Sequence, residues 1–114
     1  MDTLDDIIKK YVNSTIIHGK ESEEGNYKLA NKHYKLRSKF FEQIKGHGEL
    51  GRQELIKLLS HENGHVRVGA AFHVLSFNPD LARNVLKKSV TEPKGVGFKA
   101  KMIIKEFEKG NLTI

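Results

Sequence analysis

Apolar residues recur along this chain at intervals of three and four, the spacing that gathers them on one face of an α-helix. In the first segment these residues are Leu4, Ile7, Ile8, Tyr11, Val12 and Ile16. Thr3 is the expected N-cap, and Asp6 takes the place of the usual glutamate in a capping box. We expect this helix to end at His18 and Gly19, with a polar connector over residues 20–25.

A second and longer helix is predicted over residues 26–45. The residues predicted to share its buried face are Tyr27, Ala30, Tyr34, Phe41 and Ile44. Three of them, Tyr27, Tyr34 and Phe41, lie seven residues apart, which favours a core stripe over an exposed surface for stacking on nucleic acid. Phe40 points off this stripe, among the lysines of the opposite face.

Glycine, asparagine and proline divide the rest of the chain into further helices. We expect them over residues 53–60, 65–76, 79–90 and 97–109. The clearest start is Asn78-Pro79, because asparagine caps a helix and proline at the first helical position loses no hydrogen bond. No segment alternates with period two, so the pattern predicts an all-α fold of about six helices.

A shift of 30 residues aligns the second half of the chain with itself. It places Leu55-Ile56-Lys57 on Val85-Leu86-Lys87, and Val66, Val68, Ala70 and Phe72 on Val96, Phe98, Ala100 and Met102. We therefore predict helix–turn–helix copies at 51–80 and 81–110, stacked beside an N-terminal helical cap over 1–48. Chance similarity between helical segments is the alternative. The whole chain, 1–114, has a length typical of a single domain.

The segment from Leu55 to Leu59, followed by Asn63-Gly64-His65-Val66-Arg67-Val68-Gly69-Ala70-Ala71, resembles a HEAT or armadillo repeat. Arg67 stands where such repeats carry an arginine that ties neighbouring units together, whereas the second copy has Gly97. The C-terminal half is also similar to a small bacterial HEAT-like family of unknown function. The resemblance implies a short right-handed helical-repeat domain that binds protein or, in a minority of relatives, nucleic acid.

Two basic blocks dominate the charge of the chain, whose formal net charge is +6. Residues 26–48 hold six lysines and arginines against Glu42 alone, and residues 83–114 hold eight against three acids. Such blocks favour an anionic partner, although a solvated helix face is the alternative. The candidate partner-binding residues are Lys28, Lys32, Lys35, Arg37, Lys39, Phe40, Lys99, Lys101, Lys105 and Lys109.

One short motif suggests catalysis. His61-Glu62-Asn63-Gly64-His65 matches the zinc-protease pattern, which requires both histidines on one face of a continuous helix. Asn63-Gly64 predicts a turn instead, so helix capping is the expected role and incidental zinc or nickel binding the alternative. Gly95-Val96-Gly97 opens a helix, where anion binding is a further alternative. We expect no catalytic residue and no cofactor.

The leading expectation is a non-catalytic protein-binding module, in one form an immunity or antitoxin-like inhibitor, that meets a partner with an acidic surface. The alternative is nucleic-acid binding through the same lysines. The chain has no cysteine, an acidic N-terminal segment and no apolar run of the roughly 20 residues that a membrane span needs. We expect a cytoplasmic protein that does not enter membranes, a monomer or weak dimer.

Overall fold

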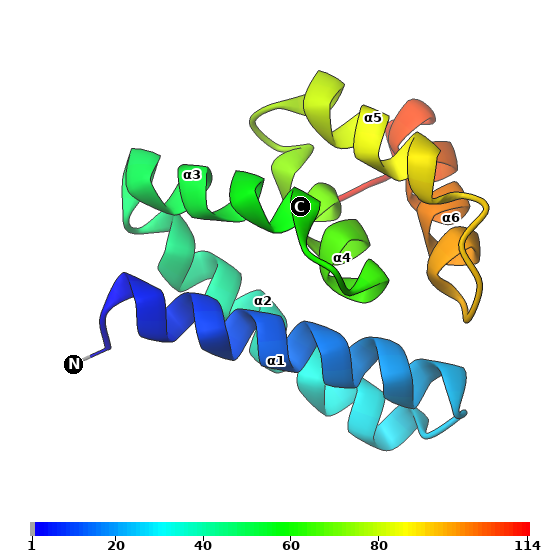
Figure 1. Ribbon diagram of the computed structural model, residues 1–114, viewed down its shortest axis with the longest axis horizontal. Coiled ribbons are helices and arrows are strands. Elements are labelled where there is room, and N and C mark those ends of the chain that lie inside the picture. Colours follow the sequence, from blue (N-terminus) through cyan, green and yellow to red (C-terminus); the bar gives the residue numbers. More distant parts are fainter. Residues whose placement is uncertain (1) are drawn as a thin grey trace. The chain divides into compact units, whose positions relative to one another are not determined.

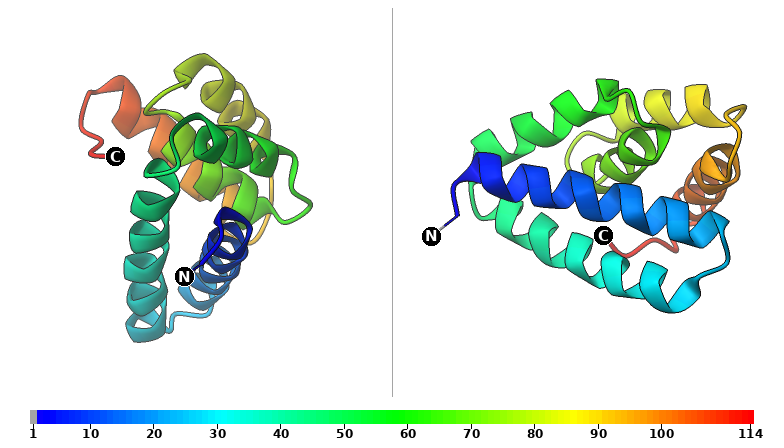
Figure 2. Two further views of the ribbon diagram at one scale, coloured as in Figure 1. Left: turned by 90° about the vertical axis from the view of Figure 1, so that its left-hand side faces the viewer. Right: turned by 60° about the horizontal axis from the view of Figure 1, so that its bottom comes forward.

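The chain divides into two compact units, one ending at Leu55 and the other beginning at Ile56. The computed structural model describes residues 2–114. The first unit is built on α1 (Leu4–Glu23) and α2 (Tyr27–Lys45), which run in opposite directions and pack along each other (Figures 1 and 2). The capping box of α1 is confirmed, because the N–H of Asp6 donates to the Thr3 hydroxyl and the N–H of Thr3 donates to the Asp6 carboxylate, both at 3.2 Å.

The end of α1 differs from the prediction. The helix continues through His18 and Gly19 to Glu23, and it stops where Gly25 adopts a φ of +77° that other residues disfavour. His18 belongs to the packing of α1 on α2, since its Nδ1 donates to the carbonyl of Ala30 at 3.0 Å. Gly19 is buried inside the helix, so this glycine is a packing residue and not a helix stop.

The buried face of α2 also differs in part from the prediction. Ala30, Phe41 and Ile44 are buried as predicted, and Arg37 is buried with them. Tyr27 and Tyr34 were predicted in the core but are 67% and 47% exposed. A seven-residue spacing drifts by about 20° per heptad around a straight helix, so a stripe of this kind leaves the core within a few turns.

After α2 the chain turns at Gly46 and enters α3 (Gly48–Lys57), which is followed by the 3-10 turn η1 (Leu58–Ser60). Helix α3 begins five residues earlier than predicted, at Gly48, whose φ is +60°. Gly51 is buried close to the end of α2, and a Cβ there would lie 2.1 Å from the carbonyl oxygen of Ile44. The glycine therefore permits a backbone contact that no larger residue allows.

The second unit is built around α4 (Gly64–Val74), which contacts η1, α5 (Pro79–Ser89) and α6 (Val96–Glu108). Helix α4 is buried on most sides, as its sequence of small and β-branched residues requires. Asn78 caps α5 by accepting from the N–H of Leu81 at 3.4 Å, with Pro79 at the first helical position. The three predicted helices in this region are confirmed, and residues 2–114 contain six α-helices and no strand.

The pattern of burial agrees with the predicted shift of 30 residues in α4 and α6, but not in the helices that precede them. Buried residues of α4 and α6 match at the predicted spacing of 30: Val66 with Val96, Ala70 with Ala100, and His73 with Ile103. In α3 to η1 and in α5 the buried residues match at 31: Gly51 with Ala82, Leu55 with Leu86, and Leu58 with Ser89. The predicted pairing of Leu55 with Val85 is therefore wrong by one residue, because the second copy has a shorter connection between its helices.

Candidate partner-binding site

Four lysines follow the exposed face of α2. Lys28, Lys32, Lys35 and Lys39, here called the α2 lysine row, are all exposed. Their spacing of four, three and four residues keeps them on the side of the helix opposite the buried Ala30 and Ile44. The row extends about 16 Å along the helix axis, at about 1.5 Å per residue.

The α2 lysine row has no acidic partner within the part of the chain that the structure describes. On other helices, basic side chains pair with carboxylates one turn away: Lys9 with Asp5 at 3.1 Å, and Arg52 with Glu49 at 2.8 Å. Helix α2 carries no acidic residue before Glu42. The positive charge of the row is therefore uncompensated along most of the helix.

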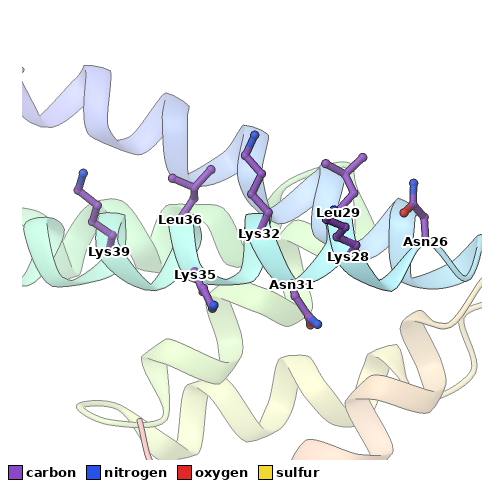
Figure 3. Close-up of a pocket in the computed structure, with 8 residues that line it drawn as sticks. All are labelled: Asn26, Lys28, Leu29, Asn31, Lys32, Lys35, Leu36 and Lys39. Atoms are coloured by element: carbon purple, nitrogen blue, oxygen red, sulfur yellow. The ribbon is translucent and has the colours of Figure 1, made fainter.

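Aliphatic side chains accompany the row. Leu29 and Leu36 are half-buried, and together with the lysines, Asn26 and Asn31 they line an open hollow of about 790 Å³ on the surface of α2. In the view of Figure 3, Leu29, Lys32, Leu36 and Lys39 point toward one edge of this exposed face, whereas Lys35 points toward the opposite edge. Phe40, one turn after Leu36, is half-buried. The surface thus combines ammonium groups with exposed hydrocarbon.

Arg37 does not belong to the exposed basic face, although its sequence neighbours suggested that it would. Its side chain is only 2% exposed, and its guanidinium lies 5.7 Å from the centre of the Tyr34 ring. It also forms a hydrogen bond with the buried Tyr11. Burial raises the pKa of Tyr11 above its ordinary value of 10.0, and the charge and hydrogen bond of Arg37 partly oppose that rise. Arg37 is therefore part of the core of the first unit.

The second basic surface lies on α6 and has a different composition. Lys101, Lys105 and Lys109 are exposed, and Lys99 is half-buried. Phe98 and Met102, one turn apart on the same side, are 71% and 43% exposed. Phe98 was not among the predicted partner-binding residues. Its position one turn from Met102 and beside Lys101 is the signal that could have identified it.

Acidic side chains interrupt this second surface. Glu108 lies among the lysines, and with Val90, Lys101, Ile104, Lys105 and Lys109 it lines an open hollow of about 440 Å³. The side chain of Glu106 accepts a hydrogen bond from Asn111 at 3.1 Å. The α6 surface is therefore mixed in charge and carries large apolar side chains, whereas the α2 surface is uniformly basic.

Arg67 links α4 to the loop between α5 and α6 within the second unit. Its guanidinium donates to the carbonyls of His61 and Glu62 at 2.7 and 2.9 Å, and it forms an ion pair with Glu92 in the loop before α6. Arg67 and Glu92 are both largely shielded from solvent, with side-chain exposures of 23% and 29%. These contacts connect the start of α4 with the loop between α5 and α6.

The corresponding position of the second copy, Gly97, cannot hold a side chain. A Cβ at Gly97 would lie 2.4 Å from the carbonyl oxygen of Val90 and 2.6 Å from that of Glu92. Its backbone N–H instead donates to the Glu92 carbonyl at 3.1 Å, and the N–H of Val96 donates to Pro93 at 3.3 Å. The N–H groups of Val96 and Gly97 therefore have partners within the loop and are not available to an anion.

The zinc-protease motif straddles a turn, as Asn63-Gly64 predicted. His61 follows η1 in an extended conformation, and His65 lies in the first turn of α4. Between them the Asn63 side chain caps α4, accepting from the N–H groups of His65 and Val66 at 2.9 and 3.3 Å. The two histidines therefore do not share a continuous helix, and no cluster of three or more potential metal ligands occurs in residues 2–114.

These features define an all-α protein of six helices with lysine-rich surfaces on two of them. No helix among the described residues is both long enough and apolar enough to cross a bilayer. No protein-family model matches the sequence, and no curated protein matches it. The crystal structure of the protein RPA1889 from Rhodopseudomonas palustris CGA009 is similar, with a TM-score of 0.83 and 20% identity over 98% of this chain and 93% of that chain. At this identity the similarity shows a shared fold.

Proposed function

We propose that the protein is a non-catalytic binding module that recognises an acidic surface of a partner protein through the α2 lysine row. The observation that carries this proposal is the absence of any acidic partner for these four lysines within residues 2–114. An ordinary solvated helix intersperses charges of both signs, as α1 and α3 do here. An uncompensated row instead accelerates encounter with an oppositely charged surface.

The proposal includes a HEAT-like arrangement of residues 51–110, with right-handed stacking of the helix pairs at 51–80 and 81–110. The link from Arg67 to the loop that contains Glu92 supports it, because such arginines tie successive units together. Repeat proteins of this kind bind partners on extended helix surfaces. One form of the proposal is an immunity or antitoxin-like inhibitor, whose partner would be a toxin with an acidic surface.

Affinity purification from the cells in which the protein is native tests the proposal. The tagged full chain is compared with a variant in which the α2 lysine row is changed to glutamate, and with a control that carries Lys9→Glu and Lys20→Glu on α1. We expect mass spectrometry to identify a protein retained by the wild type and the control, even after nuclease treatment, and lost by the row variant. Recovery of the chain alone, or of partners removed by nuclease, contradicts the proposal.

Nucleic-acid binding is the second candidate, and the exposure of Phe98 beside Lys101 favours it. Exposed aromatic rings stack on bases while lysines neutralise phosphates. This function predicts affinity for single-stranded oligonucleotides that falls steeply between about 50 and about 200 mM salt, because bound phosphates release counterions. Absence of binding at the lower salt concentration excludes it.

A further inference from the structure

Four side chains along α2 alternate between aliphatic and basic. Leu29, Lys32, Leu36 and Lys39, here called the α2 seam, are spaced by three, four and three residues and point to one side of the helix (Figure 3). This is the spacing of the contact positions in a coiled coil, where two helices meet along a stripe that repeats every seven residues. The leucines are half-buried and the lysines exposed, so the stripe is open to a further helix.

Charge complementarity identifies the kind of helix that would fit. The seam lies beside Lys28 and Lys35, and α2 has no acidic residue before Glu42. A partner helix must therefore supply carboxylates for the lysines and apolar side chains for the two leucines. The hydrocarbon stems of the lysines extend the apolar contact while their ammonium groups reach the partner's carboxylates.

We propose that the α2 seam binds an acidic amphipathic helix of a partner protein. Apolar residues of that helix recur every seventh position and pack against Leu29 and Leu36. Aspartates or glutamates three or four residues from each of them pair with Lys32 and Lys39. This inference rests on the proposed function and specifies its site and its partner.

The same surface is poorly suited to nucleic acid. Phosphates gain nothing from Leu29 and Leu36, which occupy half of the seam. The exposed aromatic rings of α2, Tyr27 and Tyr34, project roughly 160–180° away from the seam around the helix, as the rotation of about 100° per residue requires. The lysines of the seam and the exposed aromatic rings of α2 therefore do not face the same nucleic-acid ligand.

Fluorescence anisotropy of labelled peptides with the full chain tests the seam. The first probe is a synthetic acidic helix of about eighteen residues, enough to cover the seam at about 1.5 Å per residue, with leucine at every seventh position and glutamates between. The second has the same composition in permuted order, and the third is a single-stranded oligonucleotide. The variants are Leu29→Gln with Leu36→Gln, Lys32→Glu with Lys39→Glu, and the control Lys9→Glu with Lys20→Glu. Circular dichroism verifies that each is folded.

We expect the heptad peptide to bind about tenfold more tightly than the permuted one, since only the first buries both leucines. The leucine variant reduces the affinity for the heptad peptide to that for the permuted peptide, and leaves the latter unchanged. The Lys32 and Lys39 variant weakens both peptides by about tenfold or more, whereas the control stays within about twofold, because charges outside a contact contribute little.

Two results overturn the seam and leave the proposed function standing. The first is that the heptad and permuted peptides bind with equal affinity, and the second is that the leucine variant binds the heptad peptide as tightly as the wild type. In both cases the lysines would recognise negative charge without requiring a particular spacing on the partner helix. Failure of both peptides to bind also overturns the seam, while the proposed function is decided by purification of the native partner. Tighter binding of the oligonucleotide than of either peptide, lost in the Lys32 and Lys39 variant, overturns both.

Discussion

Changing Lys32 to glutamate separates the function of the α2 lysine row from its effect on the fold. Lys32 is exposed and lies four residues after Lys28 and three before Lys35. At these separations side chains on a helix are neighbours, so the wild type holds two like-charge pairs around this position. A glutamate at position 32 converts both into pairs of opposite charge.

The magnitude follows from the two pairs. Like-charge neighbours on a helix cost about 0.2–0.5 kcal/mol each, and opposite-charge neighbours stabilise by a similar amount. Changing two pairs therefore raises the free energy of unfolding by about 1–2 kcal/mol at low salt. Lys9 is paired with Asp5 at 3.1 Å, so a glutamate at position 9 replaces an attraction by a repulsion. This change lowers the free energy of unfolding by about 0.5–1 kcal/mol.

Urea denaturation followed by circular dichroism at low and high salt measures both variants. We expect Lys32→Glu to raise the transition midpoint and Lys9→Glu to lower it, with both differences shrinking as salt screens exposed charges. In the peptide assay Lys32→Glu weakens binding although the fold is more stable. Destabilisation by Lys32→Glu at low salt refutes the reasoning, because Lys32 would then have a favourable partner.

Three further predictions concern stability. Gly97→Ala should lower the free energy of unfolding by about 2–3 kcal/mol in urea denaturation, since its Cβ would lie 2.4 Å from the Val90 carbonyl oxygen. Gly110→Ala should lower it by only about 1 kcal/mol, because Gly110 has a φ of +74° but lies in open space. Equal losses in the two variants would contradict the steric argument. Arg67→Met should lower the free energy of unfolding by about 2 kcal/mol, because its hydrogen bonds are lost. A double-mutant cycle with Glu92→Gln that shows no coupling would contradict the ion pair. Burial raises the pKa of Tyr11 in the folded state, so tyrosine ionises first in the unfolded chain and the free energy of unfolding falls as the pH rises above 10.0. The urea midpoint should therefore fall less across that pH in Tyr11→Phe than in the wild type. An equal fall in both proteins contradicts the assignment.

The number and order of the helices could be predicted from sequence because their boundaries depend on local chemistry. Thr3 and Asn78 cap helices through their own side chains, and each performs the predicted role. Glycines divide into two kinds that the sequence does not distinguish. Gly25 ends a helix through its φ of +77°, whereas Gly19 continues one and is buried against other atoms. Which kind a glycine is depends on tertiary packing.

The α2 lysine row could be predicted as exposed because it lies opposite the apolar stripe. The composition of the core was harder, since Arg37 is buried while Tyr27 and Tyr34 are exposed, in conflict with their average preferences. Burial of Arg37 depends on a hydrogen bond with Tyr11 on another helix, and no local pattern encodes that contact. The repeat alignment does not indicate the exposure of Phe98, because its counterpart Val68 is fully buried.

The two basic surfaces differ in the source of the binding free energy they offer. On α2 the lysine row has no acidic partner among the described residues and alternates with aliphatic side chains, so for the proposed partner attraction between opposite charges would act first. On α6 the most exposed large side chain is Phe98, with Met102 beside it and Glu108 among the lysines, so burial of apolar area dominates and salt has less effect. If the proposed acidic partner exists, we expect it to bind α2 and not α6, because within residues 2–114 the α2 lysine row has no acid to neutralise it, whereas Glu108 lies among the lysines of α6.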